Sequence, residues 1–180
     1  MKLRIAGGGW RGRVLEAAPD SRPTQERVRE ALFSAWSPRL PGARVLDLFA
    51  GAGLVGLEAL SRGAAFCGFV DHRDAALRAL AANAARLGIE VASARLDLRR
   101  GLAELPAEWG TRFDLIFADP PYDYQGYDAL VDAVASRLAP RGEAAVEHSS
   151  RCPLAGDALR IDRTRRYGET TLTFLRSPEA

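Results

Sequence analysis

The sequence has few of the residues that build metal sites and disulfide frameworks. Its 180 residues include only two cysteines and two histidines. Cys67 and Cys152 show neither a C-x-x-C spacing nor the cysteine and histidine spacing of a zinc site, so neither feature is indicated. We therefore expect no metal and two buried, inert thiols.

Long apolar runs are also missing, although 47% of the residues are hydrophobic. No run approaches the length that spans a membrane, and the N-terminal "MKLRIAGGGWRGR" has no continuous apolar stretch followed by a cleavage site. We therefore expect a cytoplasmic protein without a membrane contact. The length favours one domain with a small appendage.

Lysine is almost absent, because every basic side chain except Lys2 is an arginine. Basic residues outnumber acidic ones in residues 1–42 and 151–180, and acidic residues prevail between them. Guanidinium groups suit bidentate contacts with phosphate. Basic terminal segments around an acidic middle segment would suit a protein whose ends bind a polyanion and whose centre binds a cation. They equally suit an ordinary solvated surface.

Short apolar segments alternate with helical patterns after residue 43. Strands are predicted at 43–49, 65–71, 91–97, 113–118 and 143–148, and helices at 54–61, 73–88 and 127–138. This alternation is typical of an α/β fold with a doubly wound, parallel sheet that helices cover on both faces.

Both ends of the chain depart from this alternation. Residues 158–177 predict two strands around Tyr167-Gly168-Glu169, which must pair antiparallel because no crossover helix fits between them. Residues 3–17 predict a small glycine-rich hairpin or a bulged strand. Residues 24–36 predict an amphipathic helix with Thr24 as its N-cap.

A glycine-rich turn follows the first strand of the predicted sheet. Gly51, Gly53 and Gly56 allow the backbone to approach a ligand closely, and Asp71 ends the second strand where a carboxylate can bind two ribose hydroxyls. The pattern indicates an adenosine-type ligand, and a nicotinamide dinucleotide fits it. Asp47, a carboxylate inside the first strand, instead favours a ligand with its own cation, such as S-adenosylmethionine. The chain also leaves no residues for the substrate domain of a dehydrogenase.

The fourth predicted strand ends in Asp119-Pro120-Pro121-Tyr122. The prolines have no N–H group and fix their φ angles, so we expect the turn to offer rigid carbonyl acceptors, for which no local donor competes, beside a carboxylate. Such acceptors suit an exocyclic amine, and Tyr122 offers a flat face for stacking a base. The segment could simply be a turn, but its place at a strand end favours a functional interpretation.

Several stretches resemble a known family. "DLFAGAGLVGLEALSRGA" (47–64) with "ADPPY" (118–122) is similar to class I S-adenosylmethionine-dependent methyltransferases that modify amino groups. "WRGR" (10–13) and "RPTQERVREALF" (22–33) resemble specifically the bacterial 16S ribosomal RNA guanine-N2 methyltransferases. The similarity extends from Leu3 to Arg176.

The resemblance implies a Rossmann-like sheet of seven mostly parallel strands with the last strand antiparallel, plus a small N-terminal hairpin and helix. It implies a basic hairpin appendage at 1–22 and a methyltransferase domain at 23–180. The implied reaction transfers a methyl group from S-adenosylmethionine to the N2 amine of a guanosine in 16S rRNA, within the small subunit or its assembly intermediate. We expect the enzyme to act as a monomer.

The resemblance also implies roles for individual residues. The cofactor is assigned to Asp47, Phe49, Ala50, Gly51, Gly53, Asp71, Asp97 and Leu98, with Asp71 on the ribose and Asp97 on the adenine amine. The target guanine is assigned to Asp119, Pro120, Pro121 and Tyr122. Family members often carry glutamate where this chain has Asp71, which shortens the reach to the ribose. Asp97 can also cap a helical turn, and the two roles are compatible.

The basic N-terminal segment gains a role from the same resemblance. We expect RNA contacts from Trp10, Arg11, Arg13, Arg22, Thr24, Arg27 and Arg29. His72 and His148 are expected at the surface without catalytic partners. Alternative functions are methylation of DNA adenine or of protein glutamine, a nicotinamide-dependent oxidoreductase, and a non-catalytic RNA-binding module.

Overall fold

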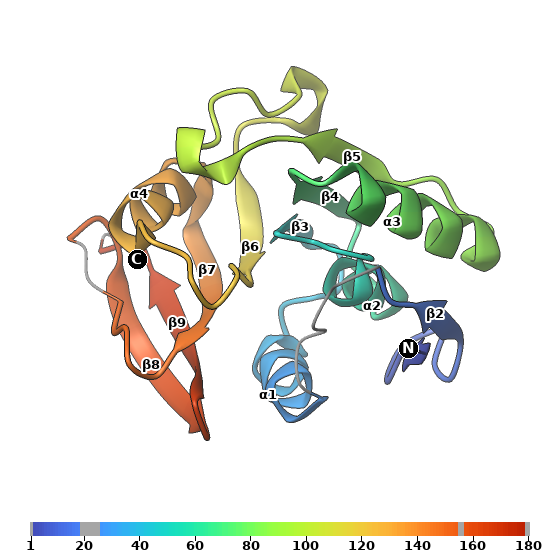
Figure 1. Ribbon diagram of the computed structural model, residues 1–180, viewed down its shortest axis with the longest axis horizontal. Coiled ribbons are helices and arrows are strands. Elements are labelled where there is room, and N and C mark those ends of the chain that lie inside the picture. The colour runs from blue at the N-terminus through green and yellow to red at the C-terminus, as the bar shows by residue number, and fades with distance from the viewer. Residues whose placement is uncertain (1, 19–25, 155–156, 179–180) are drawn as a thin grey trace.

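The computed structural model describes residues 2–18, 26–154 and 157–178. Its main sheet has seven strands in the order β5-β4-β3-β6-β7-β9-β8 (Figure 1). The strands are β3 (Arg44–Leu48), β4 (Phe66–Asp71), β5 (Ala92–Arg95), β6 (Phe113–Ala118), β7 (Leu138–Ser149), β8 (Arg160–Tyr167) and β9 (Thr170–Arg176). The pairs among β3 to β7 are parallel, and only β9 runs antiparallel to its neighbours. The predicted fold class is confirmed.

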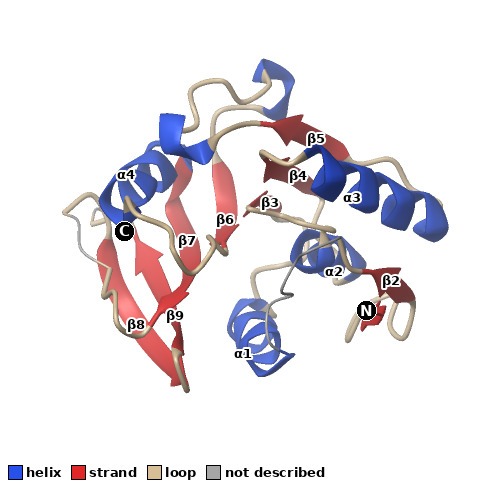
Figure 2. Ribbon diagram, viewed as in Figure 1, coloured by secondary structure: helices blue, strands red, loops and turns tan. Residues whose placement is uncertain are grey.

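Helices cover both faces of the sheet (Figure 2). One face packs against α1 (Glu26–Trp36), α2 (Leu54–Ser61) and α3 (Asp74–Leu87). The other packs against α4 (Tyr127–Arg137) and the 3-10 turns η1 (Leu98–Arg100) and η2 (Ala107–Trp109). The central strands are buried on both faces because each face lies under helices, as their nearly continuous apolar sequences predicted. No helix within the described ranges is long and apolar enough to cross a membrane.

Strand β7 begins earlier than the sequence predicted. The prediction was 143–148, but β7 starts at Leu138, directly after α4, and includes Pro140. Its pairing with β6 shifts register between Phe113 and Leu115, which accommodates the extra residues. The predicted tail hairpin is confirmed, with Gly168 in the left-handed region at φ 64°.

The N-terminal hairpin pairs β1 (Lys2–Arg4) with β2 (Val14–Glu16). Ile5 and Leu15 are buried in the same hydrophobic cluster as residues of α1 and α2. The buried carboxylate of Glu58 on α2 accepts the Ala6 N–H at 3.2 Å and pairs with Arg29 and Arg62. One acidic side chain thus joins the hairpin, α1 and α2. The domain boundary predicted at residue 22 lies outside the described residues.

A second buried carboxylate connects α1 to the tail strands. Glu143 accepts hydrogen bonds from Trp36 Nε1 at 3.0 Å, from Arg163 at 2.8 Å and from Arg176 at 2.9 Å. The strand pair β8–β9 is therefore tied to the helical layer. Cys67 is buried as predicted, whereas Cys152 is exposed, because it lies in the loop after β7 and not in the core.

Candidate active site

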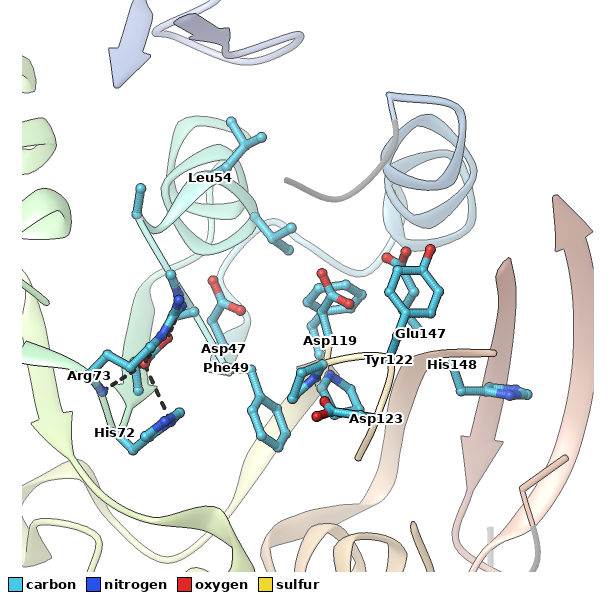
Figure 3. A pocket seen from close by; sticks show the side chains of 18 of the residues that line it. Asp47, Phe49, Leu54, His72, Arg73, Asp119, Tyr122, Asp123, Glu147 and His148 are labelled. Atoms are coloured by element: carbon cyan, nitrogen blue, oxygen red, sulfur yellow. Dashed lines mark hydrogen bonds and ion pairs between the residues drawn. The ribbon is translucent and has the colours of Figure 1, made fainter. Parts of the chain in front are cut away.

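A cavity of about 630 Å³ opens at the carboxyl ends of β3, β4, β6 and β7 (Figure 3). Strand β3 leads into α2 on one face of the sheet, and neighbouring β6 leads into α4 on the other. The two connections diverge there and leave a crevice, which is the usual ligand site of an open α/β sheet. The crevice gathers the polar strand ends that the sequence singled out.

The loop after β3 forms one wall of the cavity. Gly51 and Gly53 have φ angles of 57° and 82°, which explains the need for glycine there. Phe49 also has a positive φ of 59°, although it is a bulky residue. Its ring packs edge-on against Tyr124 with the centroids 5.4 Å apart. A strained aromatic residue held by such packing is typical of a binding site.

Asp47 projects from β3 into the cavity (Figure 3). The side chain is buried, and its Oδ2 accepts the Gly56 N–H at 2.8 Å. Burial raises the pKa of Asp47 to about 7, although the Gly56 hydrogen bond opposes the rise and the charges of Asp119 and Asp71 add to it. A cationic ligand would restore the charged form, so the carboxyl suits a ligand with an ammonium or sulfonium group.

Asp71 ends β4, the strand that lies next to β3 on the side away from β6. Its Oδ2 accepts the Gly51 N–H at 2.9 Å and its Oδ1 accepts the Arg73 N–H at 2.9 Å. The Arg73 guanidinium also contacts the carboxylate, with Nε 3.1 Å from Oδ1. Burial alone would raise the pKa of Asp71, but the hydrogen bonds from Arg73 and Gly51 outweigh burial and lower it. Asp71 is therefore ionised and fixed in place, and Arg73 occupies part of its capacity to accept hydrogen bonds.

Asp97 and Leu98 line a neighbouring cavity of about 340 Å³. The two cavities share the lining residues Phe49, His72, Pro121 and Asp123. Asp97 caps η1 by accepting the Arg99 N–H at 3.1 Å, as the sequence allowed. Hydrogen bonds from the Arg99 side chain and backbone lower the pKa of Asp97 to about 2.

The turn after β6 forms the opposite wall. The Pro121 carbonyl accepts the Tyr124 N–H at 2.9 Å, which corrects the expectation that both proline carbonyls lack a local donor. The Pro120 carbonyl accepts no hydrogen bond from another described residue. Tyr122 is 51% exposed, and its hydroxyl lies 2.8 Å from Thr170 Oγ1. The turn therefore presents the Asp119 carboxyl, one carbonyl and an aromatic ring to the cavity.

Sequence reasoning missed two residues at the end of β7. Glu147 and His148 both line the cavity and are only 6% exposed each. The expectation of a surface His148 is wrong, because its Nε2 lies 2.9 Å from Thr173 Oγ1 on the adjoining strand and its Nδ1 lies 2.9 Å from the Cys152 carbonyl oxygen. Glu147 lies one residue before the end of the predicted strand 143–148, so the rule that ligand-binding residues gather at strand ends could have found it. His72 is exposed as expected.

The stability of the protein is expected to fall between pH 6.5 and 8. Burial, and then the charge of Asp119, raise the pKa of Glu147 to about 8, while the pKa of Asp47 is about 7. The folded state holds these protons when the unfolded chain has released them, so rising pH favours unfolding. Urea unfolding should show a loss on the order of 2 kcal/mol across this window, because each proton that only the folded state holds contributes a slope of about 1.4 kcal/mol per pH unit. The variant Asp47→Asn with Glu147→Gln should flatten the slope, and an unchanged slope would contradict this assignment.

The structure separates the expected RNA-binding residues. Arg11, Arg13 and Arg27 are exposed, and Trp10 is half-buried on the hairpin. Arg29 is 5% exposed and pairs with Glu58 at 3.2 Å, so the expectation that it contacts RNA is wrong, because its charge is used inside the protein. The predicted Arg22 contact, and both the contact and the N-cap predicted for Thr24, lie outside the described residues.

Metal ligands do not gather in this cavity or elsewhere in the part of the chain that the structure describes. Within the described ranges, no three or more histidine, cysteine, aspartate and glutamate side chains form a group able to hold an ion.

Comparisons with known proteins agree with this site. Residues 3–176 match the family model described as conserved hypothetical protein 95. The chain is 36% identical over 177 residues to "Putative rRNA methyltransferase YlbH" of Bacillus subtilis, covering 93% of this chain and 95% of that protein. It is 42% identical over 123 residues to "Ribosomal RNA small subunit methyltransferase D" of Escherichia coli, covering 67% of this chain and 61% of that protein.

A solved structure supports the same relationship. "Putative methyltransferase yhhF from Escherichia coli" superposes with a TM-score of 0.85 at 30% identity, covering 98% of both chains. The match with the curated Escherichia coli relative spans less than two thirds of that protein's length, whereas the family model spans nearly all of this chain. The chain therefore belongs to the conserved hypothetical protein 95 family, a family of class I S-adenosylmethionine-dependent methyltransferases.

Proposed function

We propose that this protein transfers a methyl group from S-adenosylmethionine to the exocyclic N2 amine of a guanosine in 16S rRNA, within the small subunit or its assembly intermediate. One observation carries the proposal. The amine-accepting turn at Asp119 and Pro120 opens into the same cavity as the buried, cation-seeking carboxyl of Asp47. The Escherichia coli relative is named as a small subunit rRNA methyltransferase, which supports the choice of RNA. The protein would work as a monomer in the cytoplasm.

The residues present fit the cofactor. Asp47 would accept the ammonium group, since its burial leaves it short of a positive partner. Asp71 would accept the ribose hydroxyls in place of part of its contact with Arg73. Asp97 and Leu98 would hold the adenine in the adjoining cavity. Bound in this way, S-adenosylmethionine supplies an electrophilic methyl group.

The turn after β6 would prepare the amine. The nitrogen lone pair of a guanine amine is drawn into the ring, so the amine is a weak nucleophile. Asp119 and the Pro120 carbonyl would accept its two hydrogens and hold the nitrogen in line with the methyl group. Stacking on the exposed ring of Tyr122 would fix the plane of the base. The proton that the methylated nitrogen releases would pass to the Asp119 carboxylate.

Mapping the product tests the proposal directly. Small ribosomal subunits that lack the modification are incubated with the protein and labelled S-adenosylmethionine, and the labelled nucleotide is then identified. We expect a single N2-methylguanosine in 16S rRNA. Duplex DNA and a translation release factor serve as competing substrates. Label on an adenine amine or on a glutamine amide, with none on the subunits, would overturn the proposal.

The exposed arginines of the hairpin yield a prediction about RNA binding. The variant Arg11→Ala with Arg13→Ala should bind small subunits more weakly, and its affinity should depend less steeply on salt, because each lost phosphate contact releases one counterion fewer. Its affinity for S-adenosylmethionine should not change. Lys2→Ala is a matched control, because this exposed cation belongs to the same hairpin. An unchanged salt slope in the double variant would contradict a role in RNA binding.

A further inference from the structure

Glu147 is a buried carboxyl group with one oxygen that the fold does not supply with a hydrogen-bond donor. It is 6% exposed, and its Oε2 accepts no hydrogen bond from another described residue. The other buried glutamates differ, because Glu58 and Glu143 each pair with arginine side chains. A buried acceptor without a donor destabilises the folded protein. Its presence in a ligand cavity therefore points to a donor that a ligand brings.

The sheet places Glu147 directly beside Asp119. Ala118 on β6 pairs with Val146 on β7, so the next residue of each strand lies at the same level and on the same face. The charge of Asp119 contributes to the raised pKa of Glu147, as expected for two carboxyls at neighbouring strand ends. Figure 3 shows Asp47, Asp119 and Glu147 pointing to the same side of the sheet.

The order of the strands indicates whether Glu147 faces the cofactor or the target base. Asp71, Asp47, Asp119 and Glu147 follow one another across β4, β3, β6 and β7. Asp71 marks the ribose end under the proposed function, and Asp119 marks the amine that is methylated. Glu147 lies beyond Asp119, on the side away from the ribose. A ligand group that reaches Glu147 therefore belongs to the target base.

The edge of guanine supplies the missing donor. Next to its N2 amine, guanine carries a second donor at the ring N1–H group. The guanine N1–H favours the ionised form of Glu147, which accepts it, whereas adenine carries a bare N1 acceptor next to its amine and brings no donor to that carboxylate. We propose that Glu147 is a specificity residue that accepts the N1–H of the target guanine while Asp119 accepts the amine. This inference rests on the proposed function.

A base analogue tests the contact. After the methylated guanosine has been mapped, small subunits are assembled with 16S rRNA that carries 2-aminopurine at that position. This base keeps the amine but has a bare N1 and lacks O6. Single-turnover rates are measured on both substrates for the wild type and for Glu147→Gln. We expect the preference for guanine to fall by roughly 10- to 100-fold in Glu147→Gln, the range of one good base contact.

The design separates this contact from other effects. The loss of O6 is common to both enzymes, so the change in preference reports on Glu147 alone. Glu147→Gln should bind S-adenosylmethionine normally, which also shows that it folds. Asp128→Asn, which removes an exposed carboxylate on α4, should keep the wild-type preference.

Two results would overturn the inference while leaving the proposed function intact. One is an equal loss of rate on both substrates. That result would show that Glu147 supports the fold or the position of Asp119 and does not contact the base. The other is an unchanged preference, which would show that Glu147 does not touch N1. A wild-type enzyme that methylates no guanosine in the subunits would overturn the proposed function, and this inference with it.

Discussion

Replacing Asp119 by alanine is expected to lower methyl transfer by on the order of 10²–10³-fold, the scale of one preorganised polar contact to a reacting group. The Asp119 side chain would act only when the target amine is present, so its loss should appear in the rate of the chemical step. Affinity for S-adenosylmethionine should stay close to that of the wild type. Single-turnover methylation of small subunits measures the rate, and calorimetry measures the affinity.

Two variants of Tyr122 complete this experiment. Tyr122→Ala should reduce methylation strongly because the base loses its stacking surface. Tyr122→Phe keeps the ring but loses the hydrogen bond between the hydroxyl and Thr170, so it should retain most of the activity. Full activity of Asp119→Ala, or equal damage from both Tyr122 variants, would show that the turn does not work as proposed.

Replacing Asp71 by alanine is expected to weaken S-adenosylmethionine binding by about 2–4 kcal/mol, the free energy of two hydrogen bonds to a charged group. The carboxylate is buried, ionised and already oriented by the Gly51 N–H, so little order is lost when the ribose binds. Calorimetry on the purified variant measures the change. Asp47→Asn should weaken binding less, because an amide oxygen can still accept one hydrogen bond.

Arg73 provides the control for this prediction. Its guanidinium contacts the carboxylate of Asp71, and Asp71→Ala therefore also removes an ion pair. Arg73→Ala removes the same ion pair but keeps the carboxylate. If the ribose binds Asp71, Arg73→Ala should bind the cofactor at least as well as the wild type. Equal losses in the two variants would assign the effect to the ion pair instead.

The sequence predicted the strand ends well because a parallel sheet imposes a simple rule on them. Buried strands are apolar, so carboxylates at their ends are conspicuous, and Asp71 and Asp119 lie at the cavity as expected. The early start of β7 could not be predicted, because Pro140 normally ends a regular element and its tolerance depends on pairing with β6.

The burial of individual polar side chains also could not be predicted from the sequence. Arg29 looked like part of a basic surface, but its partner Glu58 is distant in the sequence and meets it only through the packing of α1 on α2. His148 likewise depends on Thr173, which reaches it through the antiparallel pairing of β9 with β7. The charge pattern of a segment does not reveal such partners, since tertiary contacts decide whether a cation faces water.

The contacts of the N-terminal hairpin also set an order of events during synthesis. The hairpin leaves the ribosome before α2 and α3, yet Ala6 donates to Glu58 and Glu16 donates to Asn83, which are 52 and 67 residues further along the chain. Loops of this length must close before these bonds can form, and that closure costs entropy. The hairpin is therefore anchored only after α3 has been made, so a nascent chain that stops before α3 cannot hold the hairpin in its final position.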